Sequence, residues 1–212
     1  SKDCAPDDVI VVSSTSRCNT AGHIAFTYKK GQRPIWSMGF GAMGFALPSA
    51  AGAWFASGGR RIIMLEGDGS LQLNIQELQT IRHHNINAKL FVFSNSGYAA
   101  IASMQDRNFA GFHVGSDEPS GVSMPRLEDL AKAYGFPFTR IAEDGGIEEG
   151  VRKTLAADGP VICEILGDMR FDEIPKCVSS VNAEGRRVSA ALENPWPFLP
   201  DAELAAIFER LP

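Results

Sequence analysis

Short apolar runs alternate with stretches of helical spacing along residues 1–166. The apolar runs predict buried strands at 8–13, 61–66, 88–94, 136–141 and 160–166. Between them, apolar residues at three- and four-residue steps predict helices at 21–29, 45–57, 71–82, 127–134 and 147–157. Strands that alternate with helices indicate an α/β fold of the doubly wound type, in which a mostly parallel sheet carries helices on both faces.

Residues 167–212 have a different character. Charges are scattered, Arg186 and Arg187 are adjacent, and the proline-rich segment 194–200 precedes a helix predicted at 201–210. Aromatic residues between prolines are typical of a segment that docks on another surface. We therefore expect one domain at 1–166 and a C-terminal tail at 167–212 that docks on this domain or on a partner.

Two polar loops follow two successive predicted strands. The first is Gly67-Asp68-Gly69-Ser70, and the second is Asn95-Ser96-Gly97. The helix between them is predicted to face inward with Leu71, Ile75, Leu78 and Arg82. A right-handed crossover puts both loops at the carboxyl edge of the sheet, where open α/β sheets bind ligands. We therefore expect Asp68 and Asn95 to lie within a few ångströms of each other.

The oxygen atoms of these loops suit a magnesium ion. Carboxylate, amide and backbone carbonyl oxygens are hard donors, and magnesium completes its octahedron with phosphate oxygens and water. The backbone N–H groups of Gly69 and Ser70, at a helix start, suit the phosphate itself. The residues by themselves predict a magnesium–diphosphate site. The alternative is that Asp68 is a turn or helix-capping residue and Asn95 simply ends a strand.

The two loops resemble a known signature. Gly-Asp-Gly-Ser, then a helix, a strand and Ser94-Asn95-Ser96-Gly97-Tyr98, is similar to the diphosphate-binding motif of thiamine diphosphate (TPP) enzymes. The upstream segment 37–53 and the whole of about 9–166 are similar to the acetolactate synthase-like branch. Where that family usually has Asn-Asn, this chain has Ser94-Asn95 and keeps the metal-binding asparagine. The resemblance implies the C-terminal, diphosphate-binding domain with thiamine diphosphate and Mg²⁺ as cofactors.

The resemblance also implies roles for single residues. The magnesium ligands would be Asp68, Asn95 and the backbone carbonyl of Gly97. Ser70 would offer its hydroxyl and N–H to phosphate. The rest of the cofactor cradle would be Gly41, Met43, Gly67, Gly69, Tyr98 and Ala99. Met43 would have a catalytic role as the bulky apolar side chain beneath the bent thiamine, whereas the alternative is an ordinary core methionine.

The segment Gly39–Gly44 supports a competing interpretation. It fits G-x-G-x-x-G, it opens a predicted helix, and Glu66 closes the next strand, as in the NAD-binding fingerprint of oxidoreductases. Against this, only Ile35, Trp36 and Met38 follow Pro34, so the expected strand before the glycines is weak. Glu66 also runs directly into Gly-Asp-Gly-Ser, which a nicotinamide site leaves unexplained.

Two further loops contain candidate residues. The polar loop predicted at 14–20 places Arg17-Cys18-Asn19 where acetolactate synthase-like enzymes carry Gln-His-Gln, although the residues match poorly. A long polar loop predicted at 103–124 contains Gln105 and Arg107. Long loops in compact domains are functional or mobile. In the family this region contacts substrate or other subunits, and the alternative is a solvated surface loop.

Composition excludes several classes of protein. The net charge of −5 and pI near 5.4 provide no basic surface for nucleic acid. No apolar run reaches the roughly 18 residues of a membrane span, and we recognise no signal peptide. The four cysteines lie far apart and the four histidines fall in no metal-binding spacing, so neither zinc nor a disulfide framework is indicated. A reduced cytoplasm is expected.

The resemblance implies that the chain holds half of an active site. In the family, the cofactor lies between this domain and a pyrimidine domain that supplies a glutamate. We expect the pyrimidine domain on another chain, as in two-chain sulfopyruvate decarboxylase-like enzymes, or in a missing part of the polypeptide, within a homo- or hetero-oligomer. The expected activity is that of a TPP-dependent lyase or transferase, a 2-oxo acid decarboxylase or synthase that is inactive without the pyrimidine domain. A non-catalytic partner-binding domain on an inherited scaffold remains a third possibility.

Overall fold

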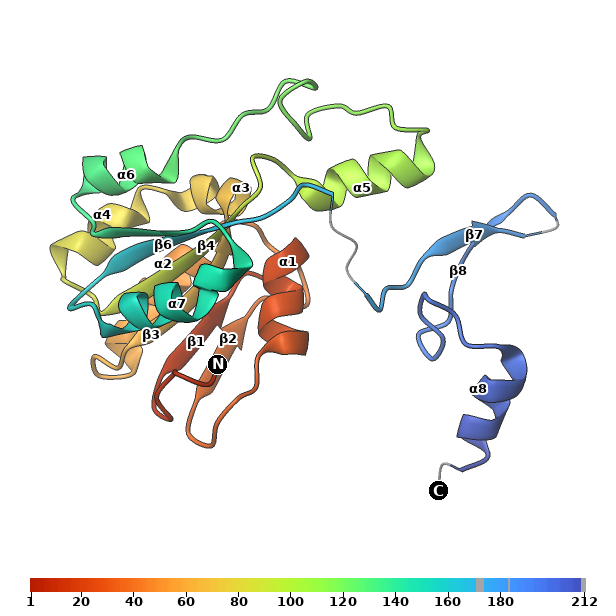
Figure 1. Ribbon diagram of the computed structural model, residues 1–212, viewed down its shortest axis with the longest axis horizontal. Helices are drawn as coiled ribbons and strands as arrows, with labels where there is room; N and C mark the ends of the chain where they lie inside the picture. The colour runs from red at the N-terminus through yellow and green to blue at the C-terminus, as the bar shows by residue number, and fades with distance from the viewer. Residues whose placement is uncertain (171–173, 183, 211–212) are drawn as a thin grey trace. The chain divides into compact units, whose positions relative to one another are not determined.

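The computed structural model describes residues 1–170, 174–182 and 184–210. The chain divides into two units, one ending at residue 171 and the other beginning at residue 172. The first unit is the α/β domain and the second is the C-terminal tail (Figure 1).

A six-stranded sheet forms the centre of the first unit. Its strands are β1 (Val9–Val12), β2 (Arg33–Trp36), β3 (Ile62–Gly67), β4 (Ala88–Ser94), β5 (Phe138–Ile141) and β6 (Val161–Leu166). They lie in the order β2-β1-β3-β4-β6-β5, and every pairing is parallel. Helices cover both faces, so the predicted doubly wound α/β fold is confirmed (Figure 1).

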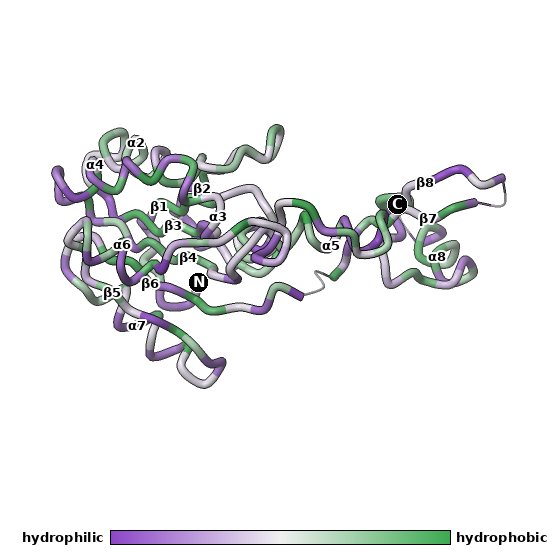
Figure 2. The backbone as a smooth tube through the Cα atoms, turned by 90° about the horizontal axis from the view of Figure 1, so that it is seen from above, coloured by the Kyte–Doolittle hydropathy of each residue, from purple (hydrophilic) through white to green (hydrophobic). Residues whose placement is uncertain are grey.

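Each face of the sheet has its own apolar core. On one side, α2 (Ala46–Ala56), α4 (Glu77–His83) and α6 (Leu127–Tyr134) pack against alternate residues of the strands. On the other side, α7 (Ile147–Ala156) and residues near α1 (Ser16–Asn19) pack against the intervening ones. Strands buried on both faces read as continuous apolar runs, which is why β3 and β4 were predictable (Figure 2).

The predicted helix at 71–82 is wrong in detail. The segment forms α3 (Asp68–Leu71), a 3₁₀ turn (Gln72–Asn74) and then α4. Because a 3₁₀ turn has fewer residues per turn than an α-helix, it shifts the phase of the inner face. Ile81 is therefore buried, and Arg82, which was expected to face inward, is exposed.

The strand β2 was not recognised in the sequence because Pro34 interrupts it. Proline is tolerated here since β2 lies at the edge of the sheet. The position of β2 also bears on the dinucleotide hypothesis. The glycine segment 39–44 and α2 connect β2 to β3, yet β1 lies between these strands. In the dinucleotide fold the fingerprint joins adjacent strands, so this topology does not favour an NAD site.

Two predicted loops are partly helical. Residues expected in the loop at 14–20 form α1, and a π-helical segment (Thr20–Ala25) replaces the helix expected at 21–29. The start of the loop expected at 103–124 belongs to α5 (Ala99–Asn108). Both segments are polar, so their sequences lack the apolar spacing that marks a helix.

The second unit contains a hairpin that the sequence did not predict. It consists of β7 (Ser179–Val181) and β8 (Arg187–Ser189), which pair antiparallel. The helix α8 (Asp201–Phe208) lies where a helix was expected, and ends two residues earlier. Across the described ranges, no helix has the length and apolar character needed to span a membrane.

Candidate functional site

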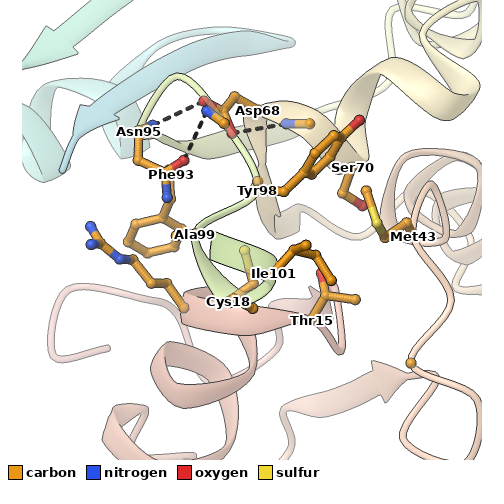
Figure 3. Close-up of a pocket in the computed structure, with 16 residues that line it drawn as sticks. Thr15, Cys18, Met43, Asp68, Ser70, Phe93, Asn95, Tyr98, Ala99 and Ile101 are labelled. Carbon is orange, nitrogen blue, oxygen red and sulfur yellow. Dashed lines mark hydrogen bonds between the residues drawn. The ribbon is translucent and has the colours of Figure 1, made fainter. Parts of the chain in front are cut away.

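A cavity of about 320 Å³ opens at the carboxyl edge of β1, β3 and β4. Its volume falls in the range of small-molecule sites. All ten residues expected to bind the cofactor line it, from three separate segments of the chain. They are Gly41, Met43, Gly67, Asp68, Gly69, Ser70, Asn95, Gly97, Tyr98 and Ala99 (Figure 3).

Asp68 joins the two loops of this edge. It is the first residue of α3, directly after β3, and its side chain is buried. Its Oδ2 accepts hydrogen bonds from the backbone N–H groups of Asn95 at 2.9 Å and Ser96 at 2.8 Å, and Oδ1 accepts one from Gly69 at 2.8 Å. The expected proximity of Asp68 and Asn95 is therefore confirmed. Burial raises the pKa of the Asp68 carboxyl, and the three N–H donors oppose that shift.

The loop after β4 is tightly constrained. The Asn95 side-chain oxygen accepts a hydrogen bond from the backbone N–H of Gly97 at 3.3 Å, and Ser96 has a positive φ of 63°. A side chain at Gly97 would lie 2.6 Å from the carbonyl oxygen of Ser116. That carbonyl also accepts a hydrogen bond from the backbone N–H of Tyr98 at 2.8 Å. The segment after α5 thus holds the loop in place, and position 97 has no room for a side chain.

Gly69 is required by the aromatic ring beside it. A Cβ at this position would lie 2.4 Å from Cε1 of Tyr98 and 3.0 Å from Cε of Met124. Only glycine lets the Tyr98 ring lie directly on the turn at 67–70. The two loops at the sheet edge are therefore in contact through this ring as well as through Asp68.

Two further polar side chains lie at this edge of the sheet. The Ser70 hydroxyl accepts a hydrogen bond from the backbone N–H of Gly44 at 2.8 Å, which leaves its own O–H as a donor, and its contact with phosphate stays a prediction. Glu66, the acid of the dinucleotide hypothesis, is fully buried and does not line the cavity. Its Oε1 accepts from the N–H of Gly67 at 3.0 Å, and burial raises the pKa of its carboxyl.

Met43 and the loop after β4 lie on opposite sides of the view into the cavity. Figure 3 shows Met43 beside Ser70, whereas Asn95 and Phe93 lie across from them. Gly41 has a positive φ of 58°, a conformation that glycine adopts without strain. This turn lets Met43, which is half-buried, reach the cavity wall.

Six residues line the cavity in addition to the ten that were expected to bind the cofactor. Thr15, Arg17 and Cys18 come from the segment after β1, and Phe93, Ala100 and Ile101 flank the second loop. Arg17 is the single cationic residue of the described cavity wall. A side chain at Gly167 would lie 2.3 Å from Arg17 Nη1, and the N–H of Gly167 donates to the carbonyl of Ser94 at 2.9 Å. The Arg17 guanidinium thus lies beside Gly167, whose backbone is bonded to the end of β4. The sequence offered one signal for Thr15, Arg17 and Cys18: they follow the apolar run of β1, and the carboxyl ends of parallel strands meet at the same edge of the sheet.

Three other candidates lie outside the cavity wall. Asn19 follows Arg17 and Cys18 but is not a lining residue. Gln105 is buried in α5 and donates to the carbonyl of Val114 at 3.0 Å, so it holds the following loop. Arg107 is exposed and donates to the Ser103 hydroxyl at 2.8 Å. Neither α5 residue faces a ligand in this cavity.

The donor set limits the metals that could bind. Among the described residues, no group of three or more His, Cys, Asp or Glu side chains could hold a metal. The set at this edge is one carboxylate, Asp68, with the amide of Asn95 and loop carbonyls. Hard oxygen donors in small number match magnesium bound together with phosphate, and they do not match zinc.

Comparison with known proteins agrees with the geometry. Residues 15–165 match the family model described as "Thiamine pyrophosphate enzyme, C-terminal TPP binding domain". The chain is 35% identical to acetolactate synthase 2, chloroplastic, of Zea mays over 145 residues, which are 66% of this chain and 23% of that protein. It is 34% identical to acetolactate synthase 1, chloroplastic, of Oryza sativa subsp. japonica and 31% identical to acetolactate synthase, chloroplastic, of Arabidopsis thaliana. Each of these matches covers 66% of this chain and 22% of the relative.

The family match spans the cavity and the strands that build it. It runs from Thr15, in the cavity wall, to Ile165 near the end of β6. The chain spans less than a quarter of the length of these acetolactate synthases. With its fold, its site and its sequence in agreement, this chain belongs to the thiamine pyrophosphate enzymes, as a C-terminal TPP-binding domain of the acetolactate synthase-like kind.

Proposed function

We propose that this chain provides the diphosphate- and magnesium-binding half of the active site of an acetolactate synthase-like enzyme. The reaction would be decarboxylation of a 2-oxo acid, or formation or cleavage of a carbon–carbon bond next to a carbonyl. The observation that carries the proposal is the cavity at the carboxyl edge, where Asp68 and the Asn95 loop meet. Thiamine diphosphate would supply the carbanion-stabilising chemistry, and the protein would supply binding, orientation and electrostatics.

The residues present fit a magnesium diphosphate group. Asp68, Asn95 and the carbonyl of Gly97 would hold Mg²⁺, since they are hard oxygen donors from loops that already contact each other. The glycines at 67, 69 and 97 keep side chains out of the space beside these loops. Arg17 would add a positive charge to the wall of the cavity that would hold the diphosphate.

Met43 would orient the cofactor rather than bind its charge. The thioether is polarizable and unbranched, so it suits packing against an aromatic heterocycle. It lies on the cavity wall beside Ser70 (Figure 3). Burial of this wall would also exclude water from the reacting centre.

The remaining half of the site would come from a pyrimidine domain. It would lie in another part of a longer polypeptide or in a separate subunit, and an oligomer would bring the halves together. The short span relative to the acetolactate synthases supports this arrangement.

Calorimetric titration of thiamine diphosphate with Mg²⁺ tests the proposal. The chain would be titrated alone and with its pyrimidine-domain partner, beside Asp68→Ala. The matched control is Asp129→Ala, which removes an exposed carboxylate on α6. We expect binding that requires Mg²⁺ and weakens at least about 100-fold in Asp68→Ala, since loss of a ligand exceeds the effect of losing an outer partner. No binding with the partner present would contradict the proposal.

A further inference from the structure

The residue after Met43 is held by two side chains from the segment that follows Asp68. Gly44 has a positive φ of 75° and lies just before α2. Its backbone N–H donates to the Ser70 hydroxyl at 2.8 Å, and its carbonyl oxygen accepts from the Asn74 side-chain amide at 2.8 Å. Both polar groups of this backbone residue are therefore fixed from outside its own loop.

The Gly44 carbonyl depends on the Asn74 amide because α2 provides no backbone N–H that bonds to it. The bond at the start of that helix runs from the N–H of Ser49 to the carbonyl of Phe45, so the Gly44 carbonyl lies outside the helix ladder. Gly44 is buried, and a buried carbonyl without a hydrogen-bond partner destabilises the fold, because the group has lost its bonds to water. The segment 37–44 also contains three glycines, which leave its backbone few intrinsic restraints.

The structure shows no helix-capping role for Asn74. It ends the 3₁₀ turn, and α4 begins at Glu77 with no side-chain cap. The amide of Gln76 donates to Asn74 Oδ1 at 3.2 Å, an arrangement that turns the Asn74 Nδ2 towards Gly44. Asn74 does not line the cavity, so any influence on a ligand passes through Gly44.

We propose that Asn74 is a positioning residue for Met43. Its amide holds the Gly44 carbonyl, Ser70 holds the Gly44 N–H, and together they fix the turn that presents Met43 to the cavity. The interruption of the helix at 72–74 places Asn74 at this turn. The role of Met43 towards thiamine rests on the proposed function, whereas the chain of contacts from Asn74 through Gly44 to Met43 does not.

Methyl NMR of the chain labelled with ¹³C-methyl methionine provides a test that needs no cofactor. The six methionines give six resonances, and Met43→Leu and Met64→Leu assign two of them. Met64 is fully buried in β3 and reports the fold. Asn74→Ala removes the donor, and Asn74→Asp also places a carboxylate against the Gly44 carbonyl. The matched control is Gln79→Glu, which makes the same amide-to-carboxylate change on the exposed face of α4.

We expect the Met43 resonance to shift or broaden in both Asn74 variants, with Met64 unchanged, and neither to change in Gln79→Glu. An unchanged Met43 resonance in Asn74→Ala overturns the proposal. A changed chemical shift of Met64 in both Asn74 variants also overturns the proposal, because Asn74 would then stabilise the whole fold rather than the turn at Gly44. Asn74→Ala remains informative if Asn74→Asp does not fold.

A second readout separates this inference from the proposed function. In the assembled enzyme, Asn74→Ala is expected to lower kcat by up to about 100-fold with little change in KM, as for a misplaced catalytic contact. If the Met43 resonance moves but kcat does not, the positioning by Asn74 stands and the role of Met43 in the reaction fails.

Discussion

The carboxylate of Asp68 and the backbone N–H of Asn95 are joined by a hydrogen bond of 2.9 Å. Because the bond uses the backbone of Asn95, the asparagine side chain remains the part of the residue that a metal could recruit. The Asp68 contacts and the proposed metal ligand are therefore separable by mutation. A variant at position 95 keeps both Asp68 bonds to this loop and loses the amide, together with the long 3.3 Å bond that the amide oxygen accepts from the Gly97 N–H.

Asn95→Ala should weaken Mg²⁺-dependent binding of thiamine diphosphate by about 10- to 100-fold. The Asp68 bonds to the N–H groups of residues 95 and 96 do not need the side chain, and the bond that the side chain accepts from the Gly97 N–H is long at 3.3 Å, so thermal stability should change little. Calorimetry and thermal unfolding measure the two effects. The control is Ser96→Ala, an adjacent exposed residue, which should bind within about twofold of wild type. Equal losses in both variants would refute a metal role for Asn95.

Gly69→Ala should destabilise the chain by about 1–3 kcal/mol, because its Cβ would lie 2.4 Å from the Tyr98 ring. Gly52→Ala is the matched control. Gly52 lies within α2, and a Cβ added there would meet nothing within 4 Å, so alanine should be neutral or stabilise the chain by up to about 1 kcal/mol. Denaturant unfolding of both variants measures the difference. Similar stabilities would mean that Tyr98 does not pack on this turn.

Arg17→Ala should weaken binding of thiamine diphosphate by about 10-fold, the value of one charge-assisted hydrogen bond. The loss should shrink at high salt, because mobile ions screen the attraction between the guanidinium and the diphosphate. Arg107→Ala serves as control, since Arg107 is exposed on α5 outside the cavity wall. Titrations at two ionic strengths measure both effects. An Arg17→Ala variant that binds as well as Arg107→Ala would exclude Arg17 from the diphosphate site.

Lys89 predicts a pH dependence of stability. It is fully buried in β4, where its Nζ donates to the carbonyls of Ala157 and Gly159 at 2.6 Å, and burial lowers its pKa to about 8. The unfolded chain keeps this proton up to its ordinary pKa near 10.5. Between these values the unfolded state binds more protons, so rising pH stabilises the folded chain.

The free energy of unfolding of wild type, relative to Lys89→Met, should therefore rise between pH 8 and pH 10.5 by about 3 kcal/mol in total. Below pH 8 the difference between the two proteins should be constant. Denaturant unfolding of both proteins at pH 7, 8, 9 and 10 measures this difference in free energy. Methionine is the chosen replacement because it removes the titrating group and keeps a long apolar side chain. A difference that stays flat or falls above pH 8 would show that the Lys89 pKa is not lowered.

The sequence by itself determined five of the six strands of the main sheet and the edge of the sheet that carries the site, and its resemblance to a known family indicated ten residues of the cavity wall. The reason is local. Strands buried on both faces must be apolar throughout, and parallel crossovers bring successive carboxyl ends together, so Asp68 and Asn95 had to converge. Glycines at 67 and 69 marked the turn between strand and helix.

Only the tertiary structure decided the features that depend on contacts between distant segments. Arg17 joins the cavity because β1 lies beside β3, and Pro34 is accepted because β2 is an edge strand. Three further features leave no local periodic signal in the sequence. They are the 3₁₀ turn at 72–74, the packing of Tyr98 on Gly69 and the hydrogen bond from Asn74 to Gly44. Periodicity reports which face of an element is buried, whereas such contacts are set by the neighbours that the fold brings to that face.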